Sequence, residues 1–213
     1  MSSAAQYFWR NKRYLYPPNW HAGAKALYRR LSKSSIFLAD DIELGLCSLD
    51  PVKKIACLIE LAKPRSVLDI GCGTGEAVKD FRSHGIEALG VEGSLSAIQR
   101  SSCREFIRQH DLRKPLSLGR TFDLVWCFEV AEHIHQLYVD IFVDSLVSHG
   151  PIIALSAAPP GQGGEGHFNE QPQGYWIGKF SDRGFILQRE WTEALQSIEE
   201  FYSPNMMVFV RGS

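Results

Sequence analysis

The chain has 213 residues, of which 45% are hydrophobic and 22% are charged. This balance is typical of a globular domain with a sizeable core, and it excludes a disordered chain, a collagen-like repeat and a disulfide scaffold. The length suffices for one α/β domain with an additional segment, but not for two full domains. No apolar run approaches the roughly 20 residues of a membrane-spanning helix, so we expect no membrane span.

The cysteines and the N-terminus both favour a cytoplasmic protein. The five cysteines are scattered and lack CxxC spacing, so we expect reduced thiols and neither disulfide bridges nor a zinc site. The first residues have no apolar segment behind their charges, which does not fit a secretory signal.

Charge is distributed unevenly along the chain, although its net value is only −1. Residues 1–33 contain seven lysines and arginines, seven aromatic residues and no acid, whereas residues 34–213 carry 16 basic and 24 acidic residues. We therefore divide the chain into a basic, aromatic N-terminal helical arm or lid, residues 1–54, and a domain, residues 55–213. The arm permits three interpretations: nucleic-acid binding, stacking on sugar faces, or packing of a helical lid onto the sheet.

Short apolar runs alternate with amphipathic stretches along most of the chain. After helices at 22–33 and 51–63, the pattern predicts strands at 66–70, 86–92, 105–111, 122–130 and 151–157. Helices are predicted at 76–84, 94–102 and 136–148, the last with Leu137, Ile141, Val143 and Leu146 on one face. A further helix is predicted at 175–184, with last strands at 185–191 and 206–212. This order predicts an α/β fold with a doubly wound, parallel sheet covered on both faces.

A long Gly/Pro-rich loop, residues 158–174, follows the fifth predicted strand. Loops of this length inside a compact domain are usually lids or binding loops. We therefore expect it to shape a binding site.

The sharpest local signal is the segment LDIGCGTG, residues 68–75. Its three glycines follow a strand directly and lead into a helix, where they let backbone amides approach a ligand at the positive end of the helix. Glu92 ends the next strand, 17 residues past Gly75, where a carboxylate can accept both hydroxyls of a ribose. Together these features predict a nucleoside-containing cofactor at the carboxyl edge of the sheet.

Two cofactor classes compete for this loop. The dinucleotide fingerprint is GxGxxG, but here the pattern is GxGxG, with Glu76 at the sixth position. Asp69, two residues before the first glycine, would repel a pyrophosphate but would attract the ammonium of an amino-acid moiety. The sequence therefore favours S-adenosylmethionine (SAM) over NAD.

Four segments in order resemble the motifs of class I SAM-dependent methyltransferases, over about residues 55–213: LDIGCGTG (68–75), VEGS (91–94), HDL (110–112) and FDLVWCFEVAEHI (122–134). The resemblance implies a Rossmann-like, mostly parallel seven-stranded sheet, with 206–212 as a final antiparallel strand. It also implies that Asp111 faces the adenine amine and Leu112 its ring, and that Cys72 contributes its amide and not its thiol. The implied cofactor contacts are Asp69, Gly71, Cys72, Gly73, Gly75, Glu92, Gly93, Ser94, Asp111, Leu112 and Phe128.

An ExxEH pattern at the end of the fourth predicted strand concerns the acceptor. A hydroxyl needs a strong base, or a cation that lowers its pKa, before it attacks the methyl group. The pattern resembles that of small-RNA 3′-terminal 2′-O-methyltransferases and ubiquinone-pathway O-methyltransferases. In the RNA enzymes such residues bind a divalent metal, with a second histidine after the fifth strand; His167 is placed similarly here.

The resemblance thus implies Mg²⁺ or Mn²⁺ at Glu129, Glu132, His133 and His167, with Glu132, His133 and His167 catalytic. Two alternatives stay open: base catalysis without metal, in which the glutamate caps a helix and the histidine acts alone, and a structural role for these residues.

The loop GHFNEQPQGYW resembles loops of methyltransferases that act in glycan and surface-polysaccharide assembly. Its hydrogen-bonding groups and rings suit a hydroxyl-rich ligand, so we expect acceptor contacts from Asn169, Gln171, Tyr175 and Trp176, although Trp176 fits a core position equally well. The prediction is an O-methyltransferase acting on a sugar hydroxyl of a glycan or a glycosylated small molecule.

Two rival functions remain: an RNA 2′-O-methyltransferase, and a non-catalytic, cofactor-binding partner subunit. An N-methyltransferase is disfavoured, because the Asn/Asp-Pro-Pro-aromatic signature is absent at 128–134. The oligomeric state is left open, and a homodimer is compatible with the sequence.

Overall fold

The computed structural model describes residues 51–164, 166–200 and 202–212. The predicted arm, including the helix at 22–33, therefore lies almost entirely outside the described residues. The helix predicted at 51–63 is present as α3 (Val52–Ala62).

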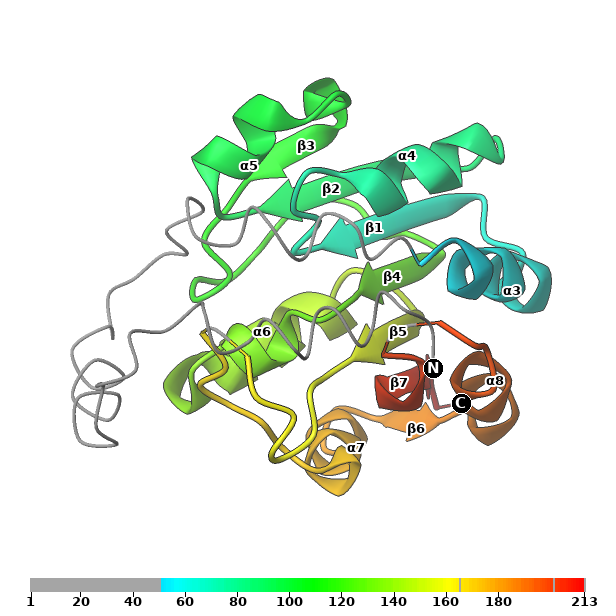
Figure 1. Ribbon diagram of the computed structural model, residues 1–213, viewed down its shortest axis with the longest axis vertical. Helices are drawn as coiled ribbons and strands as arrows, with labels where there is room; N and C mark the ends of the chain where they lie inside the picture. Colours follow the sequence, from blue (N-terminus) through cyan, green and yellow to red (C-terminus); the bar gives the residue numbers. More distant parts are fainter. Residues whose placement is uncertain (1–50, 165, 201, 213) are drawn as a thin grey trace, which may run out of the picture. The chain divides into compact units, whose positions relative to one another are not determined.

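A single seven-stranded sheet forms the centre of the described chain, with strand order β3-β2-β1-β4-β5-β7-β6 (Figure 1). β1 to β5 pair in parallel, and β7 is antiparallel to both β5 and β6. The predicted fold class, including its final antiparallel strand, is confirmed. The strands are β1 (Ser66–Ile70), β2 (Glu87–Glu92), β3 (Ile107–Gln109), β4 (Leu124–Cys127), β5 (Ile152–Ser156), β6 (Phe185–Leu187) and β7 (Met206–Arg211).

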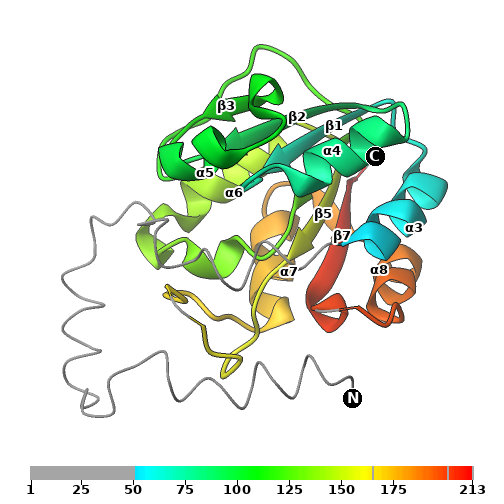
Figure 2. The same cartoon turned by 45° about the horizontal axis from the view of Figure 1, so that its top comes forward.

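Helices cover both faces of the sheet (Figure 2). The side chains of the central strands point alternately to the two faces, and most of them are apolar on each face. Trp126 and Val208 pack on one face with residues of α3, α4 (Glu76–Ser83) and α8 (Arg189–Gln196). Val125 and Phe209 pack on the other face with residues of α6 (Val139–Val147) and α7 (Gln173–Ser181). α5 (Leu95–Arg100) connects β2 to β3.

The structure corrects four of the predicted element boundaries. β4 ends at Cys127, not at residue 130, because Glu129 takes a left-handed conformation with φ of 54° that a strand cannot accommodate. β3 is reduced to three residues behind a 3-10 turn. Leu137 lies in a 3-10 turn before α6 and is 70% exposed, so it is not on the buried face. The segment predicted as a strand to residue 191 becomes helical at Arg189, the start of α8.

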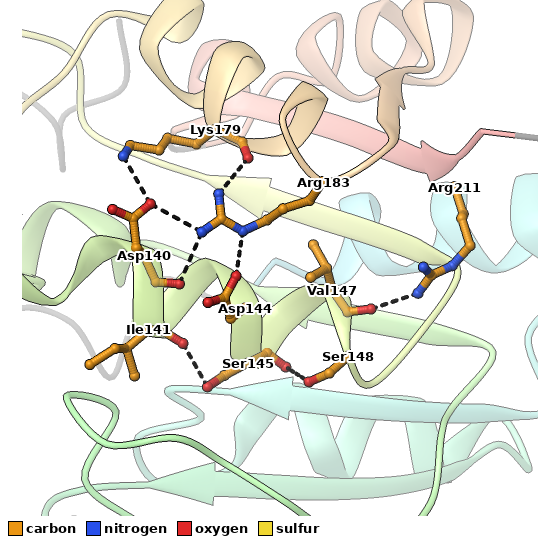
Figure 3. Close-up of polar contacts among 9 residues, drawn as sticks. All are labelled: Asp140, Ile141, Asp144, Ser145, Val147, Ser148, Lys179, Arg183 and Arg211. Carbon is orange, nitrogen blue, oxygen red and sulfur yellow. Dashed lines mark hydrogen bonds and ion pairs between the residues drawn. The ribbon is translucent and has the colours of Figure 1, made fainter.

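Ion pairs fasten α7 to α6 (Figure 3). The Asp140 carboxylate accepts hydrogen bonds from Lys179 and Arg183, and Asp144 accepts one from the Nε of Arg183 at 2.5 Å. Both aspartates are exposed. This contact fixes the helix into which the long post-β5 loop runs.

Candidate active site

The glycine loop after β1 has the predicted geometry. Gly71, Gly73 and Gly75 all have positive φ, which other residues rarely adopt. A Cβ at Gly71 would collide with the side chain of Val130, and one at Gly75 would lie 2.6 Å from the Cys103 sulfur. A Cβ at Gly73 would meet no atom of the described residues within 4 Å. Packing therefore explains two of the glycines, whereas Gly73 leaves open space, as a loop that approaches a ligand requires.

Glu92 joins the glycine loop to the turn after β2. Its carboxylate accepts the Gly73 N–H at 2.8 Å and the Ser94 N–H at 2.7 Å. Ser94 in turn caps α5 by accepting the Ala97 N–H. A carboxylate has about four lone-pair positions, so Glu92 retains acceptors for ribose hydroxyls. Gly93 lies within the same turn, where a Cβ would touch the His110 carbonyl.

Asp69 is buried at the end of β1. Burial, with a smaller contribution from the charge of Glu92, raises the pKa of the Asp69 carboxyl well above its ordinary range. A buried carboxylate that lies near a second carboxylate is costly in free energy unless a cation offsets the charge. The residues therefore fit the cationic methionine part of SAM.

The remaining predicted cofactor residues have protein partners of their own. Both oxygens of Asp111 are paired with the Arg113 guanidinium at 2.8 and 2.9 Å, which lowers the pKa of Asp111. Leu112 is buried in the core, and Cys72 packs over Gly90 with its pKa raised well above the usual range, mainly by burial. That Cys72 thiol is protonated and unsuited to act as a nucleophile.

Phe128 follows β4 and is half-buried. Its ring stacks on Trp126 at 5.5 Å, and the Lys54 ammonium lies 5.4 Å from its centroid. Lys54 is itself held by Glu200 at 3.0 Å. The role of Phe128 as a cofactor contact remains a prediction.

Glu129 begins the acceptor half of the sheet edge. Its backbone N–H donates to Ser156 Oγ, and its carboxylate accepts hydrogen bonds from Asn205 Nδ2 at 3.1 Å and Gln162 Nε2 at 3.3 Å. Asn205 also donates to Gln162, closing a three-residue network. These amides hold the Glu129 side chain in place.

Glu132, His133 and His167 converge, with one potential ligand atom of each within 4.8 Å of the others. The two imidazole rings meet edge to face, with centroids 4.9 Å apart. Of the four predicted metal ligands, the structure thus brings three into one group, and Glu129 is joined to its own amide network. One carboxylate and two imidazoles are a donor set that suits a divalent metal.

The electrostatics of the group favour a cation. Glu132 is buried, and burial together with the nearby Glu129 charge raises its pKa well above the ordinary value. Burial, with a contribution from His167, lowers the pKa of His133 to about 3. The His133 imidazole is therefore neutral at physiological pH and can act as a ligand or a base.

Both histidines present the same tautomer. The Nδ1 of His133 lies 3.0 Å from the Gly166 carbonyl oxygen, and the Nδ1 of His167 lies 2.9 Å from the Glu170 carboxylate. Because these oxygens only accept, each Nδ1 carries a proton, which in a neutral imidazole leaves the lone pair on Nε2. Oriented imidazoles of this kind are usual among metal ligands.

The acceptor residues predicted in the loop have different environments. Asn169 is buried, and its Oδ1 accepts a hydrogen bond from Gln171. Its Nδ2 has no hydrogen-bond partner within the described residues. Tyr175 is partly exposed beside Trp176. Trp176 is fully buried in the core, so its predicted contact with the acceptor is wrong and the core alternative holds.

The sequence analysis missed Glu170, Gln162 and Asn205. Glu170 lies three residues after His167, a spacing that pairs a carboxylate with an imidazole, and this was the one available signal. Asn205 precedes the antiparallel strand β7, and Met206 pairs with Ser156 at the end of β5. No sequence pattern reveals that the start of β7 reaches the same edge.

Residues 47–148 match the family model described as "Methyltransferase domain". The search of curated proteins finds no match. Among solved structures, the sugar N-methyltransferase KedS8 from Streptoalloteichus is similar with a TM-score of 0.62 and 17% identity, over 93% of this chain and 96% of that one. The fold is that of SAM-dependent methyltransferases. The sequence match and the fold together support an enzyme of this class.

Two further structures are similar. Magnesium protoporphyrin IX methyltransferase from Synechocystis, solved with bound SAM, has a TM-score of 0.62 and 19% identity, over 90% of this chain and 92% of that one. The methyltransferase domain of bacterial CtHen1 has a TM-score of 0.59 and 19% identity, over 79% of this chain and 100% of that one. These likenesses establish the fold alone. Among the described residues, no helix is long and apolar enough to cross a membrane.

Proposed function

We propose that the chain is a SAM-dependent O-methyltransferase that methylates a sugar hydroxyl of a glycan or glycosylated small molecule, assisted by Mg²⁺ or Mn²⁺. The observation that carries the proposal is the convergence of Glu132, His133 and His167 within 4.8 Å. This group lies beside the glycine loop, because Val130, in the same turn, packs against Gly71.

The two halves of this edge divide the chemistry. SAM, when bound, supplies an activated methyl group, and a divalent cation lowers the pKa of a hydroxyl that it coordinates. The glycine loop, Asp69 and Glu92 bind and orient the methyl donor. Glu132, His133 and His167 would hold the cation, and the proton of the coordinated hydroxyl would leave to solvent. Without a cation, the lone pair of a neutral imidazole would accept that proton instead. An amine acceptor would need no such group, which favours oxygen over nitrogen.

A sugar acceptor is supported by the residues beside the cluster. Within the described residues, the buried Nδ2 of Asn169 has no hydrogen-bond partner; Gln171 follows in the loop, and the partly exposed Tyr175 lies in the first turn of α7. Amides and an aromatic ring are the groups that bind hydroxyl-rich ligands. A similar fold acts on a sugar in KedS8, a sugar N-methyltransferase.

An RNA 2′-O-methyltransferase is the second candidate. It is favoured by the likeness to the CtHen1 methyltransferase domain together with the Glu132, His133 and His167 cluster. The acidic balance of residues 34–213 disfavours it, since RNA binding relies on cations that neutralise phosphates.

The test is transfer of a labelled methyl group from SAM to a panel of acceptors: deoxysugar glycosides, oligosaccharides, amino sugars and short RNAs, each with added Mn²⁺ or Mg²⁺. We expect label on a sugar oxygen. Label on RNA alone would establish the second candidate, and label on the nitrogen of an amino sugar would refute O-methylation. Cofactor binding without transfer to any acceptor would favour the non-catalytic subunit.

A further inference from the structure

Glu170 lies in the loop between β5 and α7, and its side chain makes three hydrogen bonds to other described residues of this loop. Its carboxylate accepts the Nδ1–H of His167 at 2.9 Å, the Gly161 N–H at 2.8 Å and the Gly163 N–H at 2.6 Å. The side chain is 19% exposed. One carboxylate therefore ties two separate parts of the loop together.

On one side, Glu170 determines the orientation of His167. The hydrogen bond places the proton on Nδ1 and leaves Nε2 as the nitrogen with a lone pair. The Nε2 edge of the ring packs against Gly164, where any added Cβ would collide with the imidazole. The ring is thus held at both ends.

On the other side, Glu170 holds the turn that presents Gln162. Gly161 and Gly163 flank Gln162, and both have positive φ, of 87° and 69°. With their N–H groups directed to Glu170, the side chain of Gln162 reaches Glu129 and Asn205. A substitution of Glu170 should therefore alter the hydrogen bonding of Glu129 as well as that of His167.

We propose that Glu170 is a positioning residue that couples the two ends of the acceptor site, by fixing the tautomer of His167 and the turn that holds Glu129 through Gln162. The part that concerns metal affinity rests on the proposed function. Glu170 acts through His167 and Gln162 and makes no contact with the methyl donor or acceptor in this scheme.

The test compares the full-length wild type with Glu170→Ala and Glu170→Gln, using Glu193→Gln on the exposed face of α8 as the matched control for loss of charge. Long-range ¹H–¹⁵N NMR correlations at about pH 8, where imidazoles are neutral, report the His167 tautomer in metal-free protein. Mn²⁺ titration then reports affinity. We expect an Nδ1–H tautomer in the wild type, a tautomer mixture in Glu170→Ala, and an affinity loss of about 10- to 100-fold.

The glutamine variant separates the two roles. With its oxygen in the Oε1 position it can accept the N–H groups of His167 and Gly163, but its NH₂ group, in the Oε2 position, cannot accept the N–H of Gly161. We expect it to keep the Nδ1–H tautomer while the side-chain amide signals of Gln162 shift. Unshifted Gln162 signals in this variant would overturn the inference even if the alanine variant fails to fold.

The inference is also overturned if folded Glu170→Ala keeps both the wild-type tautomer and a Mn²⁺ affinity within about twofold of the wild type. Failure of the proposed function is distinguishable. In that case the wild type itself binds no Mn²⁺, and the tautomer and the Gln162 signals still decide whether Glu170 positions these residues.

Discussion

The cofactor half and the acceptor half of the sheet edge are built in different ways. The cofactor half consists largely of backbone: three glycines with positive φ, and a Glu92 carboxylate that accepts two main-chain N–H groups. The acceptor half consists of side chains from three separate segments, namely the turn after β4, the post-β5 loop and the start of β7. Under the proposed function, the cofactor half would bind SAM mainly through backbone groups, which depend little on side-chain identity. The acceptor half would bind its acceptor through side chains, so that substitutions there would change the acceptor.

The largest expected effect is a loss of turnover with unchanged SAM affinity, which would distinguish the acceptor half from the cofactor half. Glu132→Ala and His133→Ala should each lower the turnover by about 10²- to 10⁴-fold, because both remove a group that handles the acceptor hydroxyl. SAM affinity should stay within about twofold, since neither residue belongs to the glycine loop. Turnover assays combined with calorimetric SAM titration measure both. A variant that keeps the wild-type rate would refute the catalytic assignment, and Glu193→Gln serves as the control.

The reverse experiment targets the cofactor half. Gly73→Ala adds a Cβ that meets no atom within 4 Å in the described part of the chain, so we expect a folding cost of about 1 kcal/mol but a loss of SAM affinity of about tenfold or more. Gly71→Ala forces a collision with Val130 and should cost roughly 2–4 kcal/mol in the free energy of unfolding. Denaturant unfolding and SAM titration distinguish the two.

The control for the second variant is Gly71→Ala with Val130→Ala, which should recover part of the lost stability because the collision is relieved. Equal destabilisation by Gly71→Ala and Gly73→Ala would contradict the division between a packing glycine and a ligand-facing glycine.

Competition between protons and the cation for Glu132 provides a further test of the acceptor half. A cation binds the ionised carboxylate, and the pKa of Glu132 is raised by burial and by Glu129. Mn²⁺ affinity should therefore fall as the pH falls through the raised pKa of Glu132, at a higher pH than for an exposed glutamate. His133, with a pKa of about 3, contributes nothing to this loss. Calorimetry in buffers of different ionisation enthalpy checks the proton release.

Glu132→Gln removes the titrating group and should flatten this pH dependence while weakening binding. An affinity that is independent of pH between about pH 5 and 8 in the wild type would contradict a raised pKa at a metal-binding glutamate.

The smallest effect is expected far from both halves. Asp144→Ala removes an exposed ion pair with Arg183 and should cost less than about 1 kcal/mol, with unchanged transfer and SAM affinity. Thermal unfolding and turnover measure this. A marked loss of activity would mean that the contact between α6 and α7 controls the conformation of the post-β5 loop.

The sequence predicted the cofactor half better than the acceptor half, for a physical reason. The glycine loop, Glu92 and Ser94 lie within 27 residues around one strand–helix–strand unit, so their spacing alone brings them together. The mostly parallel seven-stranded sheet and the antiparallel β7 followed from the resemblance and are confirmed.

The acceptor half depends on tertiary contacts that no local pattern contains. The resemblance carried by the ExxEH pattern predicted that Glu132 and His133 lie near His167. It did not show that Glu129 would be bound by Asn205 and Gln162. The left-handed turn at Glu129 ends β4 early, which no local pattern predicted. Trp176 was ambiguous because an aromatic residue on a helix fits a core and a binding surface equally well.

The most direct measurement is the rate of labelled methyl transfer to the best sugar acceptor, before chelation, after chelation, and after Mn²⁺ is restored. If Glu132, His133 and His167 hold a cation that activates the hydroxyl, chelation abolishes transfer to the oxygen and Mn²⁺ restores it, with SAM affinity unchanged throughout. Transfer that continues at the full rate in the chelator would contradict metal assistance and assign the proton transfer to an imidazole alone.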